Sequence, residues 1–310
     1  MNPVRQGSGN RARRGFALLV VLWFLVLLAT LGTYLLINAR SETALARNML
    51  ANAHAEALGD AGITQAVFNL TGTDPTKIWP LDGTPHTVNV LGGSVTIRLY
   101  DEGAKINPNL ASDTLLAALF EVLGLEPQKA TRLGAAIFDW THTGETPRPL
   151  GAKKKQYEEA GLNYGPPNEP AQSMDELQLV LGMTPDLFAR AAPYLTIYAN
   201  RPSPDPNTAS GIVQKAITLA GTQALKAAMA GPGGPANAPP GAPQPPSPMP
   251  PGAPVGGPQT ANAPPVTAAI EAVAHSVDGG TFFRYAVVRL DPKNPKGYVV
   301  LEWKRGVLTD

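Results

Sequence analysis

The chain has 310 residues, a formal net charge of +1 and no cysteine. This length suits one large or two small domains, and the lack of cysteine excludes disulfides, thiol catalysis and thiolate metal sites. The near-neutral charge does not favour non-specific nucleic-acid binding, although residues 1–15 hold four arginines and no acid, a local charge of +4.

The first predicted element is a long apolar helix. The 22 residues from Phe16 to Ile37 carry no charge, and this length is sufficient for a helix to cross a bilayer. Arg13 and Arg14 precede the run directly, and positive residues that flank a membrane helix stay in the cytoplasm. We therefore expect a single-pass anchor in the inner membrane, with a cytoplasmic N-terminus and a periplasmic C-terminal domain. The simplest interpretation of the apolar run is a plain membrane anchor with no further function.

The Arg13-Arg14-Gly15-Phe16 junction resembles that of the type IV prepilin class. The resemblance implies a leader at residues 1–15, recognition through Arg13 and Arg14, cleavage between Gly15 and Phe16, and N-methylation of Phe16. Most pilin-like proteins carry glutamate as the fifth residue after the cut, whereas this chain has Val20. A buried carboxylate requires a partner, which in pilin-like filaments is the methylated amine of a neighbouring subunit. A subunit without this carboxylate cannot form the pair, and in this respect the chain resembles the K-type minor pseudopilin of the type II secretion system.

The helical pattern continues beyond the apolar run. Apolar and small residues recur every fourth position from Leu45, which predicts one helix over 16–70 that ends before Thr71-Gly72. Residues 71–106 should then form the first part of a sheet. Within it, residues 86–100 read as a hairpin around a Gly92-Gly93 turn.

A helical insert is predicted over residues 107–195. Ser112 caps a predicted helix, Pro127 opens another, and Ser173 with Glu176 forms a capping box. Thr184-Pro185-Asp186 starts a further short helix. A long N-terminal helix, an antiparallel sheet and this insert together predict an α+β fold of the pilin-like type.

After the insert the pattern should return to the sheet domain. Residues 196–230 are assigned to it, with a return strand over 194–199 and a helix over 208–230. Residues 231–265 contain 14 of the 32 prolines and no charged residue, which predicts a flexible loop. Residues 266–310 should hold the C-terminal strands, at 282–290 and 297–304.

Several downstream motifs also resemble the K-type pseudopilin family. In chain order they are Asp101–Asn109, Asp139-Trp140, Ser173–Leu177 with Val180–Met183, and Asn207–Ala209. The resemblance implies a tip subunit that primes pseudopilus assembly for protein export across the outer membrane. Its implied partners are the I- and J-type minor pseudopilins, the prepilin peptidase, the inner-membrane secretion platform and membrane lipid.

The resemblance to this family also implies a calcium site after Asp139-Trp140. Calcium prefers six to eight oxygen ligands, usually including several carboxylates. This chain instead places the three lysines 153–155 in that region. Because their charges oppose calcium, the sequence predicts no cofactor, and a bound calcium ion stays open as the less favoured alternative.

No catalytic pattern competes with this interpretation. The chain has no Gly-x-Ser-x-Gly, no His-Glu-x-x-His and no phosphate-binding loop, so we expect no enzyme. The four histidines match no metal-ligand spacing. His142 beside Asp139 and Glu145 is the one cluster that could be considered, and a solvated loop explains it better than a metal site.

Two other functions stay open from the sequence. A minor pilin of a type IV pilus would share the same N-terminal features. An anchored periplasmic DNA-binding module is the third hypothesis, because residues 106–112 and 206–210 resemble the opening of helix-hairpin-helix modules, and lysines 153–155 could contact phosphate. We expect no nucleic acid, since the hairpin motif lacks its second glycine.

Overall fold

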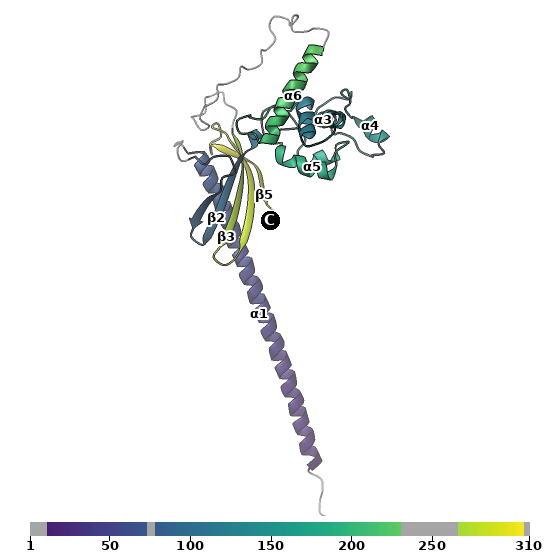
Figure 1. The fold of residues 1–310 in the computed structure, drawn as a ribbon. Coiled ribbons are helices and arrows are strands. Elements are labelled where there is room, and N and C mark those ends of the chain that lie inside the picture. Colours follow the sequence, from purple (N-terminus) through teal and green to yellow (C-terminus); the bar gives the residue numbers. More distant parts are fainter. Residues whose placement is uncertain (1–10, 73–77, 231–265, 307–310) are drawn as a thin grey trace, which may run out of the picture.

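The computed structural model describes residues 11–72, 78–230 and 266–306. The chain forms a helix-on-sheet unit and a separate helical unit at one end of the sheet (Figure 1). This arrangement confirms the predicted α+β class with a helical insert. Residues 1–10 of the predicted leader and the predicted loop 231–265 lie outside the described residues.

Helix α1 (Arg11–Leu70) is one continuous helix of 60 residues, about 90 Å long at the usual rise per residue. It begins before the expected Phe16 and ends at Leu70 as predicted. Its first half projects from the sheet as a bare rod (Figure 1). Among the residues whose side chains are described, no helix provides the uninterrupted apolar stretch needed to cross a bilayer.

The sheet has five antiparallel strands in the order β1-β2-β3-β4-β5. Their bounds are β1 His86–Val90, β2 Gly93–Asp101, β3 Thr267–Ser276, β4 Thr281–Leu290 and β5 Tyr298–Arg305.

The hairpin turn lies one residue earlier than predicted. Val90 pairs with Gly93, so the two turn residues are Leu91 and Gly92. Gly92 has the positive φ of 97° that the second central position of such a turn requires. Gly93 instead belongs to the ladder, where a Cβ would collide with the backbone oxygen of His275.

Strand β3, which the sequence analysis did not identify, is the central strand of the sheet. Its sequence is rich in alanine, a residue that favours helix. The small side chains let α1 lie close to the sheet, since a Cβ on Gly62 of α1 would already stand 3.3 Å from the Cβ of Ala272. Tertiary packing therefore overrides the local preference for helix.

The core of the helix-on-sheet unit lies between α1 and the sheet. The second half of α1 buries one face, and β2, β3 and β4 contribute alternate residues. The members of this core are Leu58, Ile63, Ala66, Val67, Leu70, Val95, Ile97, Leu99, Ala268, Ile270, Ala272, Ala274, Ala286 and Val288. Burial of this apolar surface fixes the second half of α1 against the sheet.

The helical unit lies between β2 and β3 in the chain. Its elements are η1 Glu102–Ala104, α2 Asp113–Val122, α3 Pro127–Thr141, α4 Lys154–Glu159, η2 Met174–Leu179, α5 Pro185–Ala191, η3 Ala192–Tyr194 and α6 Gly211–Ala230.

The predicted helix caps are present, with one difference. The hydroxyls of Ser112 and Thr184 each accept a backbone N–H three residues later, at 3.2 Å. The capping box of Ser173 and Glu176 also forms, but it opens the 3-10 helix η2 and not an α-helix. The capping pattern therefore predicted where this helical turn begins, but not that the turn is a 3-10 helix.

The predicted assignment of residues 196–230 to the sheet domain is wrong in two respects. Residues 194–199 form no strand, and their ladder contact is a single bridge between Ile106 and Leu195. Helix α6 packs against α2 and buries Val213 and Ala216 in the helical core. The apolar face of α6 finds its partner in the insert, so the helical unit extends to Ala230.

Candidate functional site

The first half of α1 carries exposed apolar side chains on every side. Trp23 is 69% exposed and Phe24 61%. The same holds for Leu18, Leu19, Val20, Val21, Leu22, Leu25, Val26, Leu27, Leu28, Leu31 and Tyr34. The described parts of the sheet and helical unit do not cover this surface (Figure 1), and an apolar surface of this extent indicates contact with a membrane or with other proteins.

The predicted processing residues lie at the start of this surface. Phe16 is exposed, and Val20 lies one turn later on the same face of the helix. The backbone of Arg13, Arg14 and Gly15 belongs to α1, whereas the side chains of the two arginines lie outside the described part. Cleavage after Gly15 and methylation of Phe16 remain predictions.

The second half of α1 is joined to the sheet by one buried cation as well as by apolar contacts. The Arg284 guanidinium of β4 donates to Asp60 at 2.6 Å and to Glu56 at 2.8 Å. Arg284 is 7% exposed, and its guanidinium lies over the rings of Phe282 and Trp303. Glu56 and Asp60 are one turn apart, so together they fix the rotation of α1 about its axis.

The Asp101–Asn109 signature forms the joint between the two units. The Asn107 side-chain amide donates to the carbonyls of Ile197 and Ala199, at 3.3 and 2.6 Å. The Asp101 carboxylate accepts the Thr208 hydroxyl at 2.7 Å, which brings in the Asn207–Ala209 motif. These motif residues thus hold the insert on the sheet, and they present no reactive group.

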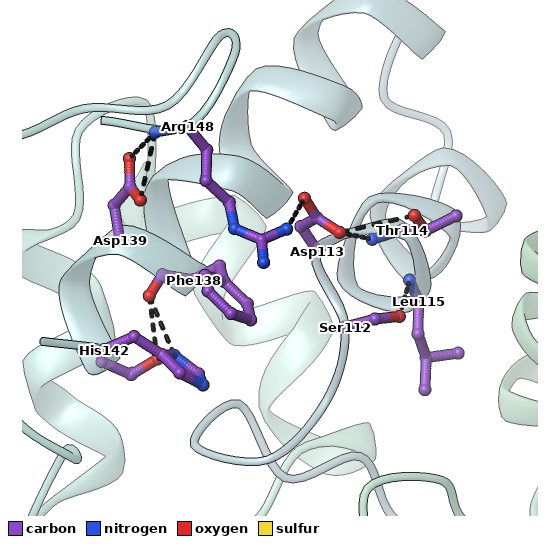
Figure 2. Close-up of polar contacts among 9 residues, drawn as sticks. Ser112, Asp113, Thr114, Leu115, Phe138, Asp139, His142 and Arg148 are labelled. Atoms are coloured by element: carbon purple, nitrogen blue, oxygen red, sulfur yellow. Dashed lines mark hydrogen bonds and ion pairs between the residues drawn. The ribbon is translucent and has the colours of Figure 1, made fainter. Parts of the chain in front are cut away.

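A second set of polar contacts follows the end of α3 (Figure 2). The Phe138 ring lies between Arg148 and His142, with a distance of 3.7 Å between the Phe138 and His142 ring centroids. The Arg148 guanidinium also donates to the Asp113 carboxylate at 2.6 Å. Burial lowers the pKa of His142, and the nearby Arg148 and Lys153 charges act in the same direction.

The Asp139 side chain turns into the loop that follows α3. Its carboxylate accepts the backbone N–H of Arg148 at 3.1 Å (Figure 2). A Cβ at Gly151 would collide with this carboxylate, which explains the glycine at that position. Burial raises the pKa of Asp139, while the Arg148 amide and the Lys153 charge oppose the rise.

Lys153 differs sharply from the two lysines that follow it. Its side chain is 6% exposed, and its ammonium donates to three oxygens of this loop region. Lys154 and Lys155 are exposed and lie near Glu158 and Glu159. Lys153 is therefore not available for the phosphate contact that the DNA-binding hypothesis considered for lysines 153–155.

The residues around His142 do not converge on a shared ligand position. The His142 ring stacks on Phe138, and its Nδ1 lies 3.0 Å from the Phe138 carbonyl oxygen. The described part of the chain contains no group of three or more histidine or carboxylate side chains arranged to hold a metal.

Two functional contacts were not identified from the sequence. One is the contact of Arg284 with Asp60, which lies far away along the chain. The other is the contact of Lys153 with Asn168, on the far side of a loop. An arginine at a strand position that is otherwise apolar was the one available signal for Arg284.

The family model and the relatives that match this chain all carry the same name. Residues 89–200 match the family model of "Type II secretion system (T2SS), protein K". The type II secretion system protein K of Klebsiella pneumoniae is 28% identical over 62% of this chain and 64% of its own length. That of Pectobacterium carotovorum subsp. carotovorum is 27% identical over 59% of this chain and 62% of its own. The chain thus spans less than two thirds of the relatives it matches.

The fold is similar to a chain of a solved structure, the GspK-GspI-GspJ complex from the enterotoxigenic Escherichia coli type 2 secretion system. The TM-score is 0.53 at 14% identity, covering 87% of this chain and 100% of that chain. This likeness confirms the predicted fold, and the matches as a whole confirm the K-type resemblance.

Proposed function

Because residues 89–200 match the family model of type II secretion system protein K, we propose that this chain is a minor pseudopilin at the tip of the type II secretion pseudopilus. It primes filament assembly for protein export across the outer membrane. Its role is structural, without catalytic activity of its own.

The observation that carries this proposal is the division of α1 into two halves. The second half packs on the sheet, while the first half exposes apolar side chains all around the helix. Such a helix can anchor the precursor in the inner membrane and later pack against other helices in a filament. The arginines before the apolar run favour a cytoplasmic N-terminus and a periplasmic C-terminal domain.

Placement at the tip is supported by two features. The first acidic residue of the chain is Glu42, so Val20 offers no carboxylate to the amine of a neighbouring subunit. The helical unit lies at the end of the sheet opposite the projecting part of α1 (Figure 1). A bulky unit there would obstruct the next subunit along the filament axis, and at the tip no next subunit is required.

The proposed partners follow from the same role. I- and J-type minor pseudopilins are proposed because a solved chain of similar fold is described in a GspK-GspI-GspJ complex. Membrane lipid, the prepilin peptidase and the inner-membrane secretion platform act on or hold the precursor. Arg13 and Arg14 would be read by the peptidase, which cuts between Gly15 and Phe16 and methylates Phe16.

The test is intact-mass and N-terminal analysis of the protein extracted from membranes, with and without an active prepilin peptidase. We expect a mature chain that begins at N-methylated Phe16 when the peptidase is present, and the uncut chain when it is absent. A chain that still begins at Met1 in the presence of active peptidase would overturn the pseudopilin proposal.

A further inference from the structure

The Lys153 ammonium sits in a complete cage of oxygen acceptors. It donates to the Asp139 carbonyl at 2.6 Å, the His142 carbonyl at 3.0 Å and the Asn168 side-chain oxygen at 2.6 Å. An ammonium has three N–H donors and no acceptor, so each donor has one partner. Because all three partners are acceptors, the cage requires the protonated form of the amine.

The cage connects three separate parts of the loop after α3. Asp139 and His142 lie at the end of α3, Lys153 precedes α4, and Asn168 lies beyond α4. Asn168 has a φ of 60°, in the left-handed region that asparagine tolerates better than most residues. From this backbone position its amide oxygen accepts from the ammonium, so the end of α3 and the segment after α4 are both tied to one positive charge.

The cage resembles a cation-binding site in which the bound cation is the ammonium of Lys153 itself. Backbone carbonyls and asparagine oxygens are also typical calcium ligands. Here these oxygens are already bound to an ammonium, and the nearby Asp139 carboxylate accepts a backbone N–H. A divalent cation at this position would meet the Lys153 charge at close range. The calcium site that family resemblance suggests therefore does not fit these residues.

We propose that the Lys153 ammonium organises residues 142–170 in place of a divalent metal ion, so that the helical unit of this chain folds independently of calcium. This inference does not depend on the secretion role, which is tested by N-terminal processing.

The first test uses the full-length wild-type protein in detergent, with thermal unfolding followed in EDTA and in about 5 mM calcium chloride, a concentration that fills sites of extracellular-module affinity. Limited proteolysis with mass spectrometry reports cleavage within 142–170 under both conditions. We expect the same Tm and the same cleavage rates. A calcium-dependent rise in Tm together with protection of 142–170 would overturn the proposal.

The second test is Lys153→Met, which keeps the side-chain stem and removes the charge. The matched control is Lys154→Met, one residue later, where the side chain is 82% exposed and its carboxylate partner is 3.9 Å away. We expect Lys153→Met to lower Tm by about 5 °C and to speed cleavage within 142–170, with no change in the control.

If Lys153→Met behaves like Lys154→Met, the cage does not organise the loop and the proposal is wrong. If Lys153→Met fails to fold while the control folds, the requirement for the ammonium is supported, and the wild-type calcium test remains the independent check of metal independence.

Discussion

The stability of the helical unit depends on pH through the imidazole ring of His142, which stacks on Phe138. Nδ1 of His142 faces the Phe138 carbonyl, an acceptor, so the neutral ring carries its proton on that nitrogen. Burial lowers the pKa of His142 below its usual value near 6.5. The unfolded chain therefore takes up the proton first as pH falls, and the folded state loses stability from about pH 6.5 downwards.

We predict that His142→Gln reduces this acid sensitivity. The comparison is the change in Tm of the full-length protein between about pH 7.5 and about pH 5.5, above and below the ordinary pKa of histidine. The wild type should lose more Tm over that interval than the variant. Equal losses would show that carboxylates, and not His142, govern the acid response.

Val20 is the residue on which the proposed tip position depends. Val20→Glu creates a carboxylate at an exposed position of α1, one turn after the proposed new N-terminus. We expect normal cleavage after Gly15, because the leader is unchanged, but reduced tip occupancy, because the variant can pair with a neighbouring amine. Secretion assays and cross-linking to I- and J-type subunits measure this. Unchanged secretion and unchanged tip occupancy would remove the argument from the missing carboxylate.

At the scale of elements, the approach of α3 to α2 is set by one glycine. A Cβ on Gly134 would stand 2.5 Å from the Asp113 carbonyl oxygen and 2.7 Å from the Ala117 nitrogen. Both neighbours are backbone atoms, which cannot move without shifting a helix. Gly221 in α6 is the opposite case, with nothing within 4 Å of the position of its Cβ.

These two glycines give a matched prediction. Gly134→Ala should lower the free energy of unfolding by about 1–3 kcal/mol through overpacking. Gly221→Ala should raise it by about 0.5–1 kcal/mol, because alanine favours helix. Chemical denaturation of the full-length variants decides the matter. A Gly134→Ala protein as stable as the wild type would mean that α2 and α3 can separate without cost.

At the scale of the molecule, the described part of the chain has two hydrophobic cores. Leu119 belongs to the helical core and Ile270 to the core under α1, and both are fully buried. The joint between them includes polar contacts of Asn107 and Asp101. Because the buried apolar residues form two separate clusters, we expect the two units to unfold with separate local stabilities.

Hydrogen exchange can test this separation. Leu119→Ala should cost about 3 kcal/mol by leaving a cavity and should speed amide exchange in α2, α3 and α6 while the strands keep their protection. Ile270→Ala should show the reverse pattern. Loss of protection throughout the chain in either variant would indicate one cooperative unit and refute the two-core description.

The sequence by itself determined the elements that depend on local chemistry. The end of α1 at Leu70, the caps at Ser112 and Thr184, the capping box at Ser173 and strands β4 and β5 were all predictable, because caps, turns and β-branched runs act over a few residues. The motifs from Asp101 to Ala209 also indicated the resemblance that the comparisons confirm. The cleavage site after Gly15 remains a prediction from sequence alone.

Only the tertiary structure decided features that depend on distant partners. Alanine-rich β3 is a strand because it pairs with both β2 and β4, and its small side chains accommodate α1 at Gly62. Helix α6 belongs to the insert because its apolar face meets α2. Lys153, which the sequence placed among three similar lysines, is buried because the backbone returns to it at His142 and Asn168. Local propensity is weak compared with burial and with the satisfaction of buried donors, so these positions follow the assembled fold.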